Sequence, residues 1–107
     1  MNYEDMIELD INANVTELEY GCGDWEFNGV EFYHCGIDGS GYFSQPVIDY
    51  CNDWAYGGLI IQNAKISLIK TDDDRWTAFE WENDGNESWH KNPLRAAMIV
   101  YLMMNEK

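Results

Sequence analysis

The spacing of hydrophobic and polar residues predicts short strands in the first third of the chain. Between residues 7 and 11, apolar and acidic positions alternate with the period of two that a half-buried strand shows. Two short stretches, 25–27 and 30–32, flank Asn28-Gly29, a dipeptide that favours a tight hairpin turn. The glycine-rich residues 36–41 predict a flexible loop.

The middle of the chain predicts one short helix and the start of a β-meander. Residues 46–54 are compatible with one or two helical turns that begin at Pro46, and Gly57-Gly58 is expected to end them. The apolar stretches 59–61 and 66–69 then predict two strands on either side of a turn.

The last third of the chain has the clearest pattern. Residues 76–81 alternate as a strand with two partly buried faces, and residues 83–86 predict a loop. Asn92 and Pro93 form a helix start, and the helix from Pro93 to about Met104 is apolar almost all round. Such a helix is expected to be buried against a sheet.

These elements together predict the α+β class. We expect an antiparallel β-meander packed against one main C-terminal helix, preceded by an acidic, strand-rich N-terminal region. A chain of 107 residues is expected to form a single compact domain over residues 1–107, with an acidic region over 1–64 and the end of the meander and the helix over 65–107.

The charged residues are distributed unevenly along the chain, and this affects the expected function more than any other feature of the composition. The chain has 20 acidic and 6 basic residues, a formal net charge of −14, and residues 1–64 contain twelve acids but no Lys or Arg. A direct nucleic-acid binder needs a basic patch, and an anionic membrane attracts basic segments, so both partners are disfavoured. At 46% hydrophobic and 15% aromatic residues, the chain is too rich in apolar groups for a disordered one. One interpretation of the charge is that it only aids solubility.

No motif indicates a membrane span, a metal or a cofactor. The first residues lack a basic, apolar signal segment, and the longest apolar stretch is only nine residues, so a cytoplasmic protein of the host cell with reduced thiols is expected. The residues able to bind zinc form no CxxC or HxxxH pair, and the adjacent His34 and Cys35 would point to opposite faces of a strand, so no metal site is predicted. The residues able to bind zinc are Cys22, His34, Cys35, Cys51 and His90.

A hydrolytic or sugar-binding site has weaker support. Glu80 and Glu82 lie two residues apart on one predicted strand, about 7 Å between their Cα atoms, a separation that glycosidase carboxylates can have. Trp76, Trp81 and Trp89 lie nearby and could form a sugar platform. Such pairs arise by chance in an acidic chain, so we expect no enzyme and keep a small ligand- or carbohydrate-binding module as an alternative.

The charge also suggests a sharper hypothesis, mimicry of nucleic acid. A rigid face of carboxylates can occupy a basic channel that normally holds DNA or guide RNA, because B-DNA itself presents one charge per about 1.7 Å of axis. Tyr42 and Phe43, expected to be exposed in the glycine loop, would add apolar anchors. The acids expected to bind the partner are Glu17, Glu19, Asp24, Glu26, Glu31 and Asp38, with Asp72, Asp73 and Asp74 as a second patch.

Several motifs resemble those of a family of small tailed-phage accessory proteins, the NinX-type proteins. The resemblance covers about residues 46–104, whereas the first 45 residues differ from the family pattern. It rests on Asp53-Trp54-Ala55, Gly57-Gly58, Ile60-Ile61, Ile66-Ser67-Leu68, Trp76, Lys91-Asn92-Pro93-Leu94 and Ala96-Ala97-Met98. Within these motifs, Trp54 and Trp76 are expected in the core, and Gly57-Gly58 at the tight entry to a strand.

The resemblance implies an origin rather than a reaction, since the family offers no catalytic residues. Phage accessory genes often encode inhibitors of host defence, including anti-CRISPR and anti-restriction proteins, and several of these are acidic DNA mimics. The resemblance therefore favours a non-enzymatic inhibitor that binds a basic surface of a host nucleic-acid-binding protein or complex. An acidic partner protein within a phage assembly or replication complex remains the other alternative.

Overall fold

The computed structural model describes residues 3–20, 25–27, 31–35, 42–71, 73–80 and 83–106. These residues form a short 3-10 helix, three α-helices and two three-stranded antiparallel sheets. In chain order they are η1 (Tyr3–Asp5), α1 (Glu8–Tyr20), β1 (Trp25–Phe27), β2 (Glu31–Cys35), β3 (Tyr42–Pro46), α2 (Trp54–Ala64), β4 (Ile66–Lys70), β5 (Trp76–Glu80), β6 (Asn83–His90) and α3 (Pro93–Met104).

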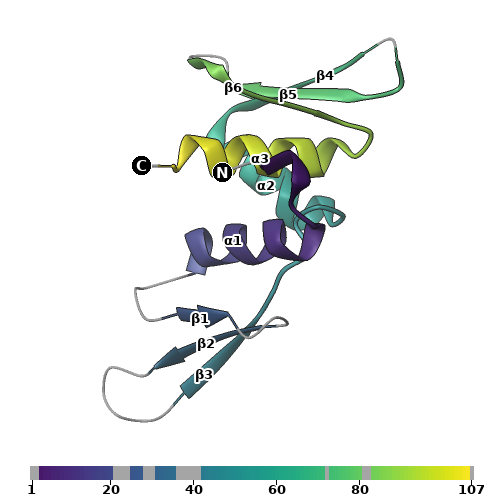
Figure 1. Ribbon diagram of the computed structural model, residues 1–107. Coiled ribbons are helices and arrows are strands. Elements are labelled where there is room, and N and C mark those ends of the chain that lie inside the picture. The colour runs from purple at the N-terminus through teal and green to yellow at the C-terminus, as the bar shows by residue number, and fades with distance from the viewer. Residues whose placement is uncertain are drawn as a thin grey trace.

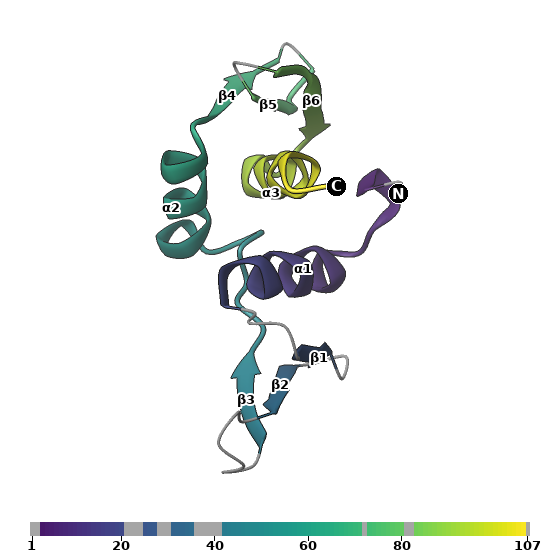
Figure 2. The ribbon, with the colours of Figure 1, turned by 90° about the vertical axis from the view of Figure 1, so that its left-hand side faces the viewer.

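The elements are stacked along one long axis. Figure 1 shows sheet β4–β5–β6 at one end, followed by α3, then α1, and sheet β1–β2–β3 at the other end. The view turned by 90° keeps the same order and shows α2 at the flank of α3 (Figure 2). The principal extents are 53 × 26 × 24 Å, so the two sheets lie far apart.

The predicted meander and C-terminal helix are confirmed, and with them the α+β class. Strands β4, β5 and β6 pair in sequence order, and α3 packs on the sheet. Asn92 caps α3 by accepting hydrogen bonds from the backbone N–H of Leu94 and Arg95, and Pro93 occupies its first turn. Residues 94–100 and Leu102 are all buried, as expected of a helix without a polar face.

The two faces of sheet β4–β5–β6 differ because side chains alternate along each strand. Leu68, Ala78 and Ser88 lie opposite one another, and Ala78 and Ser88 are fully buried on the α3 side. The neighbouring row, Ile69 opposite Thr77 opposite Trp89, lies on the other face, where Ile69 and Trp89 are exposed. Figure 1 shows no described element over that outer face.

The strand predicted at residues 7–11 is wrong, because the chain is helical from Glu8 to Tyr20. The buried positions there include Ile11, Val15 and Thr16, which have the spacing of a helix face. Ile7 and Leu9, which produced the apparent alternation, are exposed. The acidic region is therefore only partly made of strands.

The second helix begins later than predicted and replaces a predicted strand. Asp53 is its N-cap and accepts from the Ala55 N–H at 2.9 Å, so α2 starts at Trp54 rather than Pro46 and includes residues 59–61. Gly57-Gly58 lies inside the helix. Gly57 lets the helix approach its neighbours, since a Cβ there would lie 2.6 Å from the Tyr50 carbonyl oxygen.

Of three further predictions about strands, one is confirmed and two differ from the structure. The hairpin of β1 and β2 is confirmed, with Phe27 opposite Phe32, while Asn28-Gly29 lies outside the described residues. Residues 42–46 form β3 instead of belonging to the loop and the helix start. Residues 83–86 belong to β6, whose pairing with β5 is irregular between Phe79 and Glu80.

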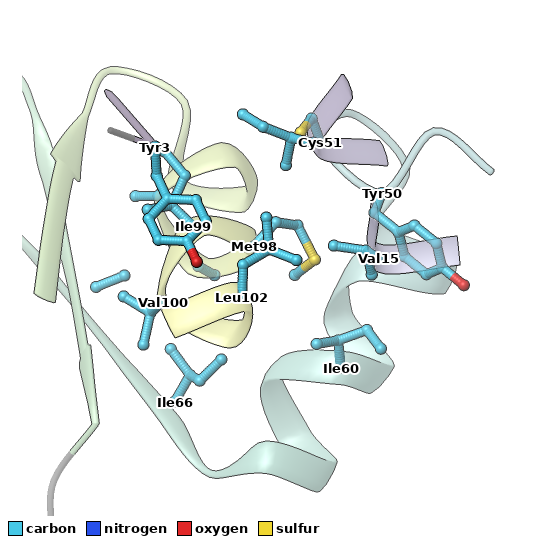
Figure 3. Close-up of a cluster of buried hydrophobic side chains, with 14 residues drawn as sticks. Tyr3, Val15, Tyr50, Cys51, Ile60, Ile66, Met98, Ile99, Val100 and Leu102 are labelled. Atoms are coloured by element: carbon cyan, nitrogen blue, oxygen red, sulfur yellow. The ribbon is translucent and has the colours of Figure 1, made fainter. Parts of the chain in front are cut away.

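The main core lies where α1, α2, α3 and the sheet β4–β5–β6 meet. Figure 3 shows Met98, Ile99 and Leu102 of α3 among side chains from the other elements. The labelled contributors include Val15 of α1 and Ile60 of α2. Each such aliphatic side chain stabilises the fold by roughly 1.5–3 kcal/mol when fully buried.

Candidate functional site

Two of the predicted acids lie at the C-terminal end of α1. Glu17 and Glu19 are both exposed, and the last turn of α1 contains no basic residue. Carboxylates at a helix C-terminus face the negative end of the helix dipole, which costs roughly 0.3–1 kcal/mol each. Glu19 accepts a hydrogen bond from the Tyr101 hydroxyl at 2.7 Å, and within the described part of the chain no cation pairs with either carboxylate.

The hydrogen bond to Glu19 also changes the titration of its donor. Burial, followed by the hydrogen bond to Glu19 and the charge of that carboxylate, raises the pKa of Tyr101 to about 12. Tyr101 belongs to α3, so this contact ties the acidic end of α1 to the C-terminal helix.

Two more predicted acids are placed on one face of the N-terminal sheet by the strand register. Position 26 in β1 lies opposite Tyr33 of β2, and position 31 is two residues from Tyr33 on the same strand. Because faces alternate along a strand, positions 26 and 31 belong to the same face. The predicted residues Asp24 and Asp38 lie outside the described residues.

The two predicted apolar anchors lie in β3 rather than in a loop. Tyr42 pairs with Cys35, which puts position 42 on the face that holds positions 26 and 31. Phe43 pairs with His34, on the opposite face. Of the two predicted anchors, only position 42 therefore shares a face with the acidic positions of this sheet.

The second predicted acidic patch is a turn in which one of the carboxylates is paired with a cation of the same turn. Asp73 pairs with Arg75, with 2.5 Å between Oδ2 and a guanidinium nitrogen, and accepts a hydrogen bond from Thr71. The hydrogen bond from Arg75, followed by that from Thr71, lowers the pKa of Asp73 to about 2. Asp74 is exposed with a φ of 65°, and Asp72 lies outside the described residues.

The two acidic sets do not form one surface. The turn between β4 and β5 belongs to the sheet at one end of the molecule, whereas β1 and β2 belong to the sheet at the other end (Figure 1, Figure 2). A single partner face would therefore contact the N-terminal set alone or the turn alone.

The two described tryptophans of the C-terminal sheet, Trp76 and Trp89, do not share a platform. Trp76 pairs with His90, while Trp89 pairs with Thr77, so adjacent rows place Trp76 and Trp89 on opposite faces. Glu80 accepts a hydrogen bond from Asn86 at 2.8 Å, and Trp81 and Glu82 lie outside the described residues. The expected position of Trp54 in the core is wrong, since it is 57% exposed on α2, and Trp76 is half-buried.

A polar cluster that the sequence did not predict joins α1, the segment before α2 and the start of α3. Asn12 is only 6% exposed; its amide donates to Asp49 at 2.9 Å and its carbonyl accepts from the Cys51 N–H at 3.0 Å. Asn92, besides capping α3, donates to the Cys51 carbonyl at 2.6 Å and to Asn52 at 3.2 Å. The only sequence signal for this cluster was the cap at Asn92.

The one cysteine whose side chain the structure describes is not arranged for catalysis. The pKa of Cys51 is raised to about 12, chiefly by burial and then by the Glu8 carboxylate, while Arg95 lowers it and Asp49 raises it slightly. A buried thiol of this kind is a poor nucleophile. Among the residues that the structure covers, no three His, Cys, Asp or Glu side chains gather as a metal site requires.

No helix in the described ranges combines the length and the apolar character that crossing a bilayer requires. No curated protein and no solved structure matches the chain.

One family model matches almost the whole sequence. It is described as "Bacteriophage P22, NinX" and matches residues 2–105. The match is longer than the motifs after residue 46 indicated, and it includes the acidic N-terminal region and α1. The motifs around Asp53 and Asn92 meet in space, since Asn92 contacts the segment that precedes α2. The chain therefore belongs to the NinX family of phage proteins.

Proposed function

We propose that this phage protein binds a basic surface of a host protein that acts on nucleic acid and thereby inhibits it, without catalysing a reaction. The proposed host protein belongs to a defence system that targets nucleic acid, of the restriction or CRISPR type. One observation carries the proposal. The N-terminal end of the molecule collects acids on α1 and on one face of sheet β1–β2–β3, in a region of 64 residues without Lys or Arg.

The electrostatics of α1 support a cationic partner. Glu17 and Glu19 lie where the helix dipole is unfavourable, and the described part of the chain supplies no cation to offset the cost. Lys or Arg side chains of a partner would remove this repulsion on binding. A partner site built to hold phosphates has such side chains and would also attract the protein from a distance.

The strand register supports one composite surface rather than scattered charge. Positions 26 and 31 share a face with position 42, so a tyrosine lies among the acidic positions. Charge pairs at the rim of an interface mainly raise the association rate, whereas a buried aromatic side chain adds affinity. The Asp73 carboxylate is left out of this surface, because Arg75 already pairs with it.

Protection of a phage tests the proposed inhibition directly. The protein would be produced in bacteria that carry a restriction or CRISPR system, and the plating efficiency of a susceptible phage would be measured. We expect it to rise with the wild-type protein and to return to the unprotected level with Glu26→Lys/Glu31→Lys. A matched control, Glu87→Lys, reverses an exposed acid on β6 at the far end and should still protect. Equal protection by all three proteins would contradict the proposed surface.

Salt dependence tests the proposed chemistry. A partner captured from a host lysate should dissociate between about 50 and 200 mM salt and should be displaced by duplex DNA, since the same cations bind both. The Glu17→Gln/Glu19→Gln variant should bind more weakly while it unfolds at a similar temperature. Capture of a phage structural or replication protein that DNA does not displace would instead favour the assembly alternative.

A further inference from the structure

Helix α2 presents an uncharged outer surface in a chain of net charge −14. It contains no acidic or basic residue, and Trp54, Tyr56 and Leu59 are 57%, 44% and 55% exposed. Figure 2 shows α2 at the flank of the molecule, with α3 on its inner side and no described element over its outer side. Exposed apolar residues grouped on one helix mark a surface for protein contact.

The surface has the shape that a second helix needs. Gly57 and Ile60 are buried toward the protein, so the opposite side of α2 displays Ala55 and Leu59, four residues apart, with the half-buried Gly58 beside them. Gly58 lies against the Trp54 ring, since a Cβ there would be 3.9 Å from Trp54 Cε3. A neighbouring helix can approach closely over the small residues, with Leu59 in the centre of the contact and Trp54 beside it.

The charges at the two ends of α2 indicate which helix fits. Asp53 caps the N-terminus and Lys65 follows the C-terminus, and both are exposed. A helix of this length spans about 16 Å. A second copy of α2 related by a two-fold axis perpendicular to the helix runs antiparallel, so each Asp53 falls beside the Lys65 of the other copy. The apolar centre and the opposite charges at its ends are thus self-complementary.

We infer that two copies of this chain associate through α2, packed antiparallel across a two-fold axis. Self-association elsewhere is opposed by charge, because the N-terminal end carries acids without cations. The outer face of sheet β4–β5–β6 is a poorer site for a second copy, since the exposed acid Glu87 lies on it opposite Phe79. The inference is independent of the proposed inhibition.

Sedimentation of the full chain at about 1 μM to 1 mM tests the inference across weak and moderate affinities. We expect a concentration-dependent species of twice the 12.5 kDa chain mass. Leu59→Glu should leave a folded monomer throughout, because it places a charge in the centre of the contact. Ile69→Glu, at a site that is 56% exposed on the outer face of the sheet, is the matched control and should leave the dimer intact.

The charged ends give a second, independent readout. Lys65→Asp should weaken the dimer about tenfold. At each end of the helix pair, Asp53 of one copy would then face an acid instead of a lysine. Adding Asp53→Asn should recover part of the loss, since asparagine still caps the helix but carries no charge. A chain that stays monomeric at every concentration, or a dimer lost with Ile69→Glu but kept with Leu59→Glu, would overturn the inference.

Discussion

Asn92 connects the start of α3 to Cys51, 41 residues earlier in the chain, because its side-chain amide donates to the Cys51 carbonyl at 2.6 Å. The carbonyl oxygen of the same side chain caps α3 by accepting from the Leu94 N–H at 3.0 Å. One asparagine thus satisfies a helix end and fixes the segment that leads into α2. The amide can do both because its nitrogen donates while its oxygen accepts.

Replacing Asn92 by alanine should therefore cost more than the loss of an ordinary cap. A lost cap costs about 1 kcal/mol, and the second hydrogen bond adds about 1 kcal/mol more. Chemical denaturation of Asn92→Ala should show a fall of about 2 kcal/mol in the free energy of unfolding. Asn92→Asp keeps the cap acceptor but loses the donor. Its free energy of unfolding should therefore lie between those of Asn92→Ala and the wild type. The control Asn14→Ala removes an amide that bonds only its own helix, to the Asp10 carbonyl, and should change stability less.

Asn12 should be sensitive to charge, because its amide lies 2.9 Å from an Asp49 oxygen. Asn12→Asp replaces that donor with a second carboxylate in a buried position, where two like charges cannot both be accommodated at low cost. We expect a loss of about 2–3 kcal/mol at pH 7, measured by urea unfolding. The loss should shrink as the pH falls toward 4, because one shared proton restores a donor between the two groups. Asn14→Asp is the control, and a pH-independent loss in Asn12→Asp would contradict the account.

The C-terminal elements could be predicted because their signals are local. The cap at Asn92, the proline after it and the apolar residues up to Met104 lie within one segment, and α3 forms there as expected. The alternation in residues 76–81 likewise predicts a strand with two partly buried faces, and β5 forms over residues 76–80. Each of these patterns is decided by neighbours in sequence.

The N-terminal helix and α2 could not be predicted because distant residues decide them. The buried Asn12 and Thr16 read as surface positions, yet Thr16 accepts from the Ile48 N–H at 3.1 Å. The glycine pair in α2 reads as a helix end. Gly57 is instead the place where α2 touches Tyr50 and Leu94, a contact invisible in a local pattern.

The candidate site was predictable in its charge and not in its geometry. The absence of Lys and Arg before residue 65 is a fact of sequence, but the shared face of positions 26 and 31 follows only from the strand register. The pairing of Asp73 with Arg75, two residues away, removes one predicted contact residue. In the sequence, Asp73 stands out as part of an acidic cluster, although Arg75 follows two residues later.

Tyr101 should make stability depend on pH in the alkaline range. Its folded pKa of about 12 lies above the ordinary value of 10.0, because burial and then Glu19 disfavour the phenolate. Because the pKa is higher in the folded state, the contribution of Tyr101 to the free energy of unfolding is complete below pH 10 and is lost as the pH rises to about 12. Urea midpoints should thus fall less steeply over this range in Tyr101→Phe than in the wild type. Glu19→Gln should lower the pKa of Tyr101 but leave it above 10, since burial is the larger cause; a value at or below 10 would contradict that ranking.

The two adjacent glycines of α2 should respond in opposite directions to the same substitution. At Gly57 a new Cβ would lie 2.6 Å from the Tyr50 carbonyl oxygen and 2.8 Å from Leu94 Cδ2, so helix and core must separate. We expect Gly57→Ala to lower the free energy of unfolding by about 1–3 kcal/mol. At Gly58 the nearest atom would be Trp54 Cε3 at 3.9 Å, an ordinary contact. Gly58→Ala should therefore raise the free energy of unfolding by about 0.5–1 kcal/mol, because alanine restricts the unfolded chain and favours the helix. Thermal and urea unfolding of the two variants side by side would measure this difference, and equal losses in both would show that α2 does not pack on Tyr50 and Leu94 through Gly57.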